Sequence, residues 1–393
     1  MVIHPKIRGF ICTNAHPVGC AAHVQQQIDF IQQQPKIEAV PQRVLVIGCS
    51  TGYGLATRIA TAFGAGAKTI GVCFEKEPTE KRTGTAGWYN TAAFHEAAQA
   101  AGLYAKSFNG DAFSNEMKAE VIEQIKEDFG QVDLVVYSLA SPKRKDPNSD
   151  QVFSSTLKPV GQAYTTKTYD TDRDEVKEIS LEPANDDEIA QTIKVMGGED
   201  WELWLDALNQ AGVLAPNCKT TAYTYIGKEL TWPIYGHATI GKAKEDLDRA
   251  AAAMRARYTN LNLEAYVSSL KALVTQASSA IPVMPLYISL IYGVMKEEGT
   301  HEGCIEQIYR LLTEGLYAAN PKLDEAGRLR MDGKETNDAT QAKIKALWDQ
   351  VNQDNFHQLA DYEGYHSDFL KLFGFGIAGV DYDADVDPVV SWS

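Results

Sequence analysis

A tyrosine and a lysine nine positions apart, Tyr235 and Lys244, have the side chains needed to place a proton on an oxygen that gains negative charge. A phenol can donate to such an oxygen, and a nearby ammonium group stabilises the phenolate that is left. Nine residues span about two and a half helical turns, so both groups reach one cleft only if Tyr235 lies at or just before the first turn. Tyr225, at the end of an expected strand, is a second phenol that could reach the same oxygen. Because the chain has 18 tyrosines and 37 lysines and arginines, chance also produces such pairs, and the surrounding fold must decide.

A glycine-rich turn follows an apolar stretch near the start of the chain. Residues 43–47 have the composition of a buried strand, and the next seven residues place glycines in a G-x-x-x-G-x-G pattern: Gly48, Cys49, Ser50, Thr51, Gly52, Tyr53 and Gly54. Glycines permit a tight turn and a close approach to a ligand, while the amides and dipole of a following helix attract phosphate. An ordinary strand-to-helix turn is the alternative. In this context the segment predicts a site for the pyrophosphate of a dinucleotide.

A second strand-like segment, residues 69–74, ends at Glu75, twenty-one residues after Gly54. A dinucleotide fold places an acid at that distance to accept hydrogen bonds from the adenosine ribose hydroxyls. A carboxylate there also repels a 2′-phosphate, so it favours NADH over NADPH. Three basic residues nearby could neutralise such a phosphate and keep the second cofactor open: Lys76, Lys81 and Arg82.

The remaining elements favour an α/β fold. Strand-like and helical segments alternate over residues 103–108, 116–129, 132–139, 220–226, about 235–257 and within 261–274. Such alternation predicts a Rossmann-like, doubly wound parallel sheet with helices on both faces. We therefore expect a dinucleotide-binding and catalytic domain over residues 1–320 and a helical extension, packed on the same body, over residues 321–393.

Residues 142–217 interrupt the alternation with polar sequence and two amphipathic helical segments, 186–196 and 200–211. The second helical segment carries large apolar side chains that need a surface to pack against: Trp201, Trp204 and Leu205. We therefore expect an insertion that packs on the main body rather than a linker.

The composition disfavours several classes of partner. Acidic residues outnumber basic ones by 52 to 37, and the formal net charge of −15 disfavours nucleic acids and anionic membranes. The N-terminus lacks an apolar run with a small-residue cleavage site, and the six cysteines are scattered, so reduced thiols in the cytoplasm are expected. An apolar run at residues 280–295 contains Pro282 and Pro285, which makes it too short and too broken for a membrane span. A monomeric enzyme acting on a small molecule fits these features.

Two clusters invite a binding interpretation. The first cluster consists of Cys12, His16, Cys20 and His23. Its spacings could suggest a metal site, but a proline interrupts it and no Cys-x-x-Cys pair is present, so structural roles and no metal are expected. The basic segment Lys143-Arg144-Lys145 could meet phosphates or an acidic partner, although a solvated loop is the simpler interpretation.

The chain resembles the V-type bacterial enoyl-acyl-carrier-protein reductases and trans-2-enoyl-CoA reductases, long relatives of the short-chain dehydrogenases. The resemblance spans the whole chain and rests on four segments: Pro5-Lys6-Ile7-Arg8-Gly9-Phe10-Ile11-Cys12, the glycine turn, Tyr137-Ser138-Leu139-Ala140-Ser141-Pro142, and Tyr235-x8-Lys244. It implies hydride transfer from NADH to the β carbon of an enoyl-CoA or enoyl-carrier-protein substrate in fatty acid biosynthesis. Tyr235, helped by Tyr225, would then stabilise the enolate, and Lys244 would hold the nicotinamide ribose.

Further cofactor contacts are implied by the resemblance at matching positions: Phe74 and Glu75, Asp111 and Ala112, Leu139 and Ala140, and Leu273, Val274 and Thr275. For the apolar members of this set, packing in the core is the plain alternative. For such a reaction, residues 280–295 are expected to form a lid over the acyl chain, because a mobile apolar helix can exclude water from hydride transfer.

Two other functions stay open. Carbonyl-reducing short-chain dehydrogenases use Tyr-x3-Lys, whereas the residue four places after Tyr235 is Thr239, which disfavours reduction of a 3-ketoacyl substrate. A nucleotide-sensing protein could use the same fold without turnover. No flavin motif is visible, so direct hydride transfer is the simpler expectation.

Overall fold

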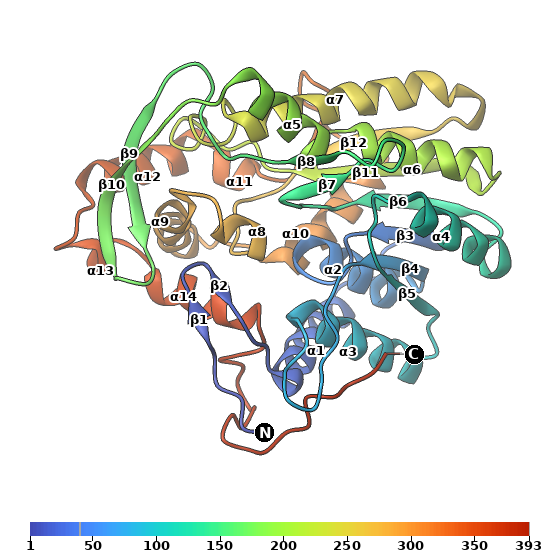
Figure 1. Ribbon diagram of the computed structural model, residues 1–393, viewed down its shortest axis with the longest axis horizontal. Coiled ribbons are helices and arrows are strands. Elements are labelled where there is room, and N and C mark those ends of the chain that lie inside the picture. Colours follow the sequence, from blue (N-terminus) through green and yellow to red (C-terminus); the bar gives the residue numbers. More distant parts are fainter. Residues whose placement is uncertain (39–40, 393) are drawn as a thin grey trace.

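The computed structural model describes residues 1–38 and 41–392, which fold around a central seven-stranded sheet (Figure 1). The strand order is β13-β12-β11-β6-β3-β4-β5, and every neighbouring pair is parallel. The strands are β3 (Arg43–Ile47), β4 (Lys68–Cys73), β5 (Ala105–Asn109), β6 (Val132–Tyr137), β11 (Leu214–Thr224), β12 (Glu264–Ser269) and β13 (Leu329–Arg330). The order changes direction between β3 and β6, where parallel sheets of this type open a ligand crevice beyond their carboxyl ends. The expected Rossmann-like, doubly wound sheet is confirmed.

Helices cover both faces of this sheet. In β3, Leu45 and Ile47 pack against one apolar cluster while Val44 and Val46 pack against another, and all four are fully buried. The first cluster includes side chains from α4 (Asn115–Asp128), α6 (Glu199–Gln210) and α7 (Thr239–Arg257), and the second from α1 (Pro17–Gln33), α2 (Gly52–Ile59), α3 (Ala86–Ala100) and α10 (Cys304–Arg310). Burial on both faces explains why the strands read as continuous apolar runs.

Helix α7 begins at Thr239, four residues later than expected, and Tyr235 lies in the preceding turn. Gly236, which disfavours the interior of a helix, lies in the first turn that was expected and is consistent with the delay. Strand β12 is likewise shorter than the stretch 261–274, because the chain leaves the sheet after Ser269 and continues as an irregular segment beside the glycine turn.

The insertion contains more strand than expected. Besides α5 (Asp186–Met196), which matches its predicted bounds, it forms two antiparallel hairpins: β7 (Lys143–Lys145) with β8 (Val152–Ser154), and β9 (Tyr164–Asp170) with β10 (Glu175–Leu181). The side chains of Trp201 and Trp204 on α6 are fully buried against the sheet, as their apolar character required.

Helix α9 (Met284–Glu297) is part of the core in this structure, and the lid expected over residues 280–295 stays a prediction. Eleven of its fourteen residues are buried, and it packs against β9, α12 (Asp338–Gln350) and α14 (Tyr362–Lys371), as Figure 1 shows. A helix that is apolar on all sides belongs to a core. The short helix α8 (Gln276–Ser279) precedes it. Within the described ranges, no helix is both long and apolar enough to cross a membrane.

The last part of the chain is helical but also joins the sheet. Strand β13 pairs with β12, and α11 (Gly333–Thr336), α12, α13 (Phe356–Leu359) and α14 follow. The tail then returns to α3, where Trp88 Nε1 donates to the Val390 carbonyl at 2.6 Å. A purely helical extension was therefore an incomplete prediction, because the pairing that holds a two-residue strand is set by tertiary contacts. The division at residue 320 stays a prediction.

Candidate active site

The glycine turn connects β3 to α2 and has the geometry of a phosphate site. Gly48 and Gly52 adopt positive φ values of 87° and 52°, which side chains disfavour. A Cβ atom on Gly54 would lie 1.8 Å from the Gly48 carbonyl oxygen, so the helix backbone can approach the turn this closely only with glycine. Among the described residues, the amides of Ser50 and Thr51 donate to no backbone acceptor. These amides lie at the N-terminal end of α2 and fit an anionic pyrophosphate.

Glu75 lies beyond the carboxyl end of β4 and contacts the turn directly. Ser50 Oγ donates to Glu75 Oε1 at 2.5 Å, and Thr85 Oγ1 donates to Oε2. Burial raises the pKa of the Glu75 carboxyl, and the two hydroxyl donors oppose that rise. Phe74 beside it is 81% exposed, which leaves its ring accessible to a ligand.

The next two predicted pairs follow β5 and β6 at the same edge of the sheet. Asp111 Oδ1 accepts from the Phe113 amide at 2.9 Å, and the Ala112 carbonyl accepts from Trp204 Nε1 at 3.0 Å. Leu139 is half-buried and Ala140 exposed, and Leu139 Cδ2 lies 3.1 Å from the position of a Cβ on Gly48. The structure thus places Leu139 next to the turn.

The segment after β12 forms the opposite wall. A Cβ on Gly52 would lie 3.8 Å from Thr275 Cγ2, and the Thr275 side chain caps α8 by accepting from the Ser278 amide. Leu273 and Val274 are buried, and the Val274 amide already donates to Tyr292 Oη at 3.2 Å. A cavity of about 250 Å³ reaches from Thr51 and Gly52 to these residues.

Tyr225 and Tyr235 lie together beyond the end of β11. Their ring centroids are 5.0 Å apart with an interplanar angle of 81°. Tyr235 is 7% exposed, and burial raises the pKa of its phenol, although the backbone of Tyr225 opposes that rise. Tyr225 Oη instead donates to Glu335 Oε1 at 2.9 Å. In this arrangement the single hydrogen of the Tyr225 phenol points at Glu335, and its expected contact with a substrate oxygen stays a prediction.

Lys244 projects from the face of α7 that meets the Tyr235 turn. A Cβ on Gly241 would lie 2.6 Å from the Tyr235 carbonyl oxygen, and Lys244 is three residues further along the same face. In residues 1–38 and 41–392, its ammonium group makes no hydrogen bond or ion pair, and burial lowers its pKa to about 8. An ammonium without a partner in a partly buried site is characteristic of a functional group.

Two buried charges near this site were missed by the sequence analysis. Lys271 is 2% exposed and lies 5.0 Å above the Tyr292 ring, and Glu335 is fully buried beside Tyr225. Lys271 could have been identified from the sequence, because it is the single lysine in the largely apolar stretch 266–274. Glu335 lies in a charged segment of mixed composition and gave no signal.

The two clusters from the sequence have structural contacts. His16 caps α1, accepting from the Gly19 amide through Nδ1 at 3.1 Å, and within the described chain no group of three or more potential ligands could hold a metal. The basic segment is strand β7 rather than a solvated loop. Arg144 is 2% exposed, and its ion pair with Glu199 Oε2 at 2.8 Å compensates for the burial of its charge. Lys143 and Lys145 are exposed.

Three family models match consecutive parts of the chain. The NAD(P)H-binding domain of trans-2-enoyl-CoA reductase matches residues 2–80, the catalytic region of trans-2-enoyl-CoA reductase matches residues 82–317, and a domain described as the FAD-binding domain of enoyl reductase matches residues 323–386. The first two contain the glycine turn, Glu75, Tyr235 and Lys244.

The side chains of residues 323–386 do not fit a flavin. Within the described chain, the four buried side-chain polar atoms that lack a partner lie elsewhere, on His16, Arg144, His301 and Tyr317. The apolar and aromatic side chains of the segment pack into the core around α9, among them Phe356, Tyr365 and Phe369. The G-x-G-x-x-G pattern at Gly374, Gly376 and Gly379 follows helix α14 and precedes no helix in the described residues, so it is not the strand-to-helix turn that receives a pyrophosphate. The dinucleotide site alone therefore accounts for the redox chemistry.

Full-length relatives and solved structures agree with these models. NADH-dependent enoyl-acyl-carrier-protein reductases of Idiomarina loihiensis and Pseudoalteromonas atlantica are 73% and 72% identical, each over 100% of both chains. Trans-2-enoyl-CoA reductase of Clostridium acetobutulicum in complex with NADH superposes with a TM-score of 0.96 at 43% identity, covering 99% of this chain and 98% of that one. The enzyme of Treponema denticola in complex with NAD gives 0.95 at 48% identity over 100% of both chains. The chain belongs to the family of NADH-dependent enoyl-acyl-carrier-protein and trans-2-enoyl-CoA reductases.

Proposed function

We propose that this protein reduces the 2,3 double bond of trans-2-enoyl thioesters to the saturated acyl thioester in fatty acid biosynthesis, using NADH. One observation carries the proposal most strongly. Tyr235 is a buried phenol in the turn just before α7, Lys244 on that helix has no partner among the described residues, and the chain also carries a turn suited to a dinucleotide. A carbonyl reductase of the same fold would need its lysine one helical turn from the tyrosine.

Each side chain then has one task. Bound NADH supplies the hydride, which forms a new C–H bond at the β carbon while the π electrons move to the thioester oxygen. Tyr235 donates a hydrogen bond to that oxygen as it becomes an enolate. The carbonyl then re-forms as a proton derived from solvent adds to the α carbon, which leaves the saturated thioester and NAD⁺. Lys244 holds the nicotinamide ribose hydroxyls, and its positive charge favours transfer of the phenolic proton. Burial of Tyr235 excludes water from the step.

The direct experiment compares substrates in one NADH oxidation assay. Oxidation of NADH with a 2-enoyl thioester and not with the matching 3-ketoacyl thioester supports the proposal. The reverse preference would identify a carbonyl reductase, and binding of NADH without turnover of either would identify a sensing protein.

Glu75 should select against NADPH. In the Glu75→Ala variant we expect the ratio of kcat/KM for NADH to that for NADPH to fall by about tenfold or more, because placing like charges together costs several kcal/mol. Removal of the carboxylate also leaves exposed Lys76, Lys81 and Arg82 to attract a 2′-phosphate. Steady-state kinetics with both cofactors measures the ratio. An unchanged ratio would remove Glu75 from the selectivity mechanism.

The exposed lysines of β7 are proposed to meet the carrier of the substrate. Arg144 must be left out of the test because it is buried, so the informative variant is Lys143→Glu/Lys145→Glu. We expect KM to rise about tenfold for the carrier-bound substrate, since like charges slow association with an acidic partner. Parallel assays with CoA and carrier-protein thioesters measure it, and unchanged KM values for both would exclude the contact.

A monomeric state and a cytoplasmic location stay predictions.

A further inference from the structure

The carboxylate of Glu335 joins the substrate side of the active site to its cofactor side. Its Oε1 accepts from Tyr225 Oη at 2.9 Å, and its Oε2 accepts from the Ala272 amide at 2.7 Å. Ala272 directly precedes Leu273, Val274 and Thr275, the expected contacts of the nicotinamide carboxamide. Tyr287 Oη on α9 also donates to Oε1 at 2.9 Å. One fully buried carboxylate therefore has three donors from three different segments.

Lys271 and the Ala272 amide favour the ionised, accepting form of this carboxylate. Burial raises the pKa of Glu335, while the nearby ammonium group of Lys271 and the Ala272 amide oppose that rise. Lys271 Nζ donates to the Ala272 carbonyl at 3.0 Å, so the residue between Lys271 and Leu273 is held at both its amide and its carbonyl. Since all three contacts of Glu335 are donors, the Tyr225 hydrogen points at Glu335.

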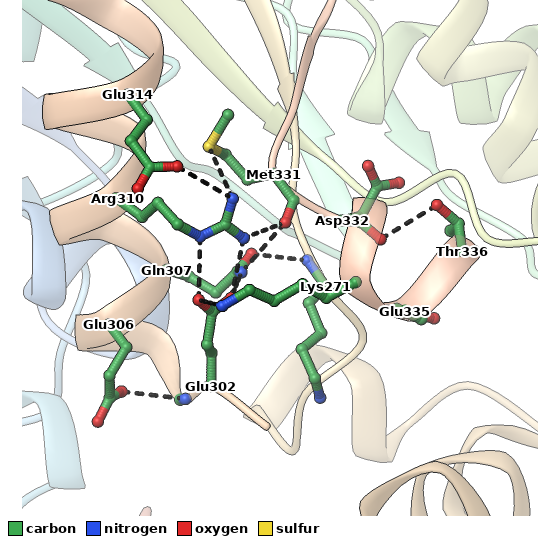
Figure 2. Close-up of polar contacts among 12 residues, drawn as sticks. Lys271, Glu302, Glu306, Gln307, Arg310, Glu314, Met331, Asp332, Glu335 and Thr336 are labelled. Atoms are coloured by element: carbon green, nitrogen blue, oxygen red, sulfur yellow. Dashed lines mark hydrogen bonds and ion pairs between the residues drawn. The ribbon is translucent and has the colours of Figure 1, made fainter. Parts of the chain in front are cut away.

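A second polar cluster fixes the position of the segment that carries Glu335 (Figure 2). Gln307 accepts from the Lys271 amide at 3.1 Å and donates to the Met331 carbonyl at 3.2 Å. Arg310 donates to Glu302 through two bonds of 2.9 Å, and Glu302 also accepts from Gln307. The cluster thus ties residues 331–335 to the loop at 271 through α10. These contacts, rather than the short helix that contains it, hold Glu335 in place.

We propose that Glu335 is a positioning residue for the reductase reaction, which fixes Tyr225 and, through the packed rings, the catalytic phenol of Tyr235. The proposal rests on the proposed function and on the role of Tyr235 given above. It also assigns a task to the C-terminal segment, whose family description names a cofactor that its side chains do not fit. Glu335 touches neither the expected substrate nor the cofactor and acts through its neighbours.

The variant Glu335→Gln isolates the link to Tyr225. Glutamine has the same shape, and its oxygen can still accept from the Ala272 amide, so its NH₂ group faces the two phenols. The charge-assisted bonds from Tyr225 and Tyr287 are then replaced by weaker neutral ones with reversed direction. We expect kcat/KM for a 2-enoyl thioester to fall about tenfold, while the Kd for NADH changes by less than about twofold.

The double variant Glu335→Gln/Tyr225→Phe supplies the readout that a purely structural role would not produce. If Glu335 acts through Tyr225, the double variant should be no worse than the more damaging single variant. Glu264→Gln is the matched control, because Glu264 accepts from Tyr266 Oη at 2.6 Å and from Lys219 Nζ at 2.7 Å at the amino end of β12, away from the crevice. It should keep wild-type kinetics.

Kinetics of Glu335→Gln like those of the wild type, or losses that multiply in the double variant, would overturn the proposal. These outcomes differ from a failure of the proposed function itself. Wild-type protein that does not turn over 2-enoyl thioesters overturns the function, whereas an active wild type with an impaired Tyr225→Phe variant and an unimpaired Glu335→Gln variant overturns only the role of Glu335.

Discussion

Replacement of Tyr235 by phenylalanine should lower kcat for a 2-enoyl thioester by about 10²- to 10⁴-fold, the range over which general acids contribute. The ring stays in place against Tyr225, at a centroid distance of 5.0 Å, so the loss is confined to the hydroxyl. We do not expect Tyr225 to replace the lost proton donor, because its hydrogen points at Glu335. Steady-state NADH oxidation measures the change, and NADH binding followed by fluorescence should match that of the wild type.

Tyr266→Phe is the control for loss of a buried phenol. Tyr266 is 9% exposed and donates to Glu264, well away from the carboxyl ends of the strands. Its variant should keep wild-type turnover. Near wild-type kcat in Tyr235→Phe would contradict the assignment of the proton donor.

Loss of Lys244 should have the second largest effect. In the Lys244→Met variant we expect kcat/KM to fall about 100-fold, because one buried electrostatic contact to a developing charge is worth roughly two to three powers of ten. The same group gives a pH dependence with a defined sign. Burial lowers the pKa of Lys244 to about 8, so the ammonium form is present below that pH and is lost above it. Activity of the wild type should therefore decline as the pH rises through about 8.

Lys244→Arg tests that assignment, since a guanidinium stays protonated over the whole range. The alkaline decline should move to higher pH in this variant, even where its overall rate is lower. Burial raises the pKa of Tyr235, so this phenol does not account for a decline near 8. A decline that keeps its midpoint in Lys244→Arg would assign the titration to another group.

The parts of the site that could be predicted are those encoded in local sequence. Gly48 and Gly54 mark the turn because a side chain there would clash with backbone, and Gly52 because its positive φ disfavours side chains. Glu75 follows from the length of one strand-helix-strand unit. The Tyr235–Lys244 spacing could be interpreted once the turn was known. The fold class followed from strands buried on both faces, which give apolar runs that alternate with helices.

The parts that could not be predicted depend on tertiary contacts. Strands β9 and β10 are rich in threonine, lysine and glutamate and are partly exposed, so they lack the apolar alternation that identifies a strand. Arg144 is buried only because Glu199, far along the chain, pairs with it. Glu335 becomes part of the site through hydrogen bonds to residues 110 and 63 positions away, which no local pattern records.

The central claim is that hydride passes directly from NADH to the β carbon of an enoyl thioester. It is tested by turnover in ordinary water of NADH that carries deuterium at both nicotinamide C4 positions, with the label in the product located by NMR. We predict a saturated acyl thioester with one deuterium at C3 and none at C2. Deuterium on the carbinol carbon of a 3-hydroxyacyl product, or a saturated product whose label has been lost to water through an intervening flavin, would contradict it.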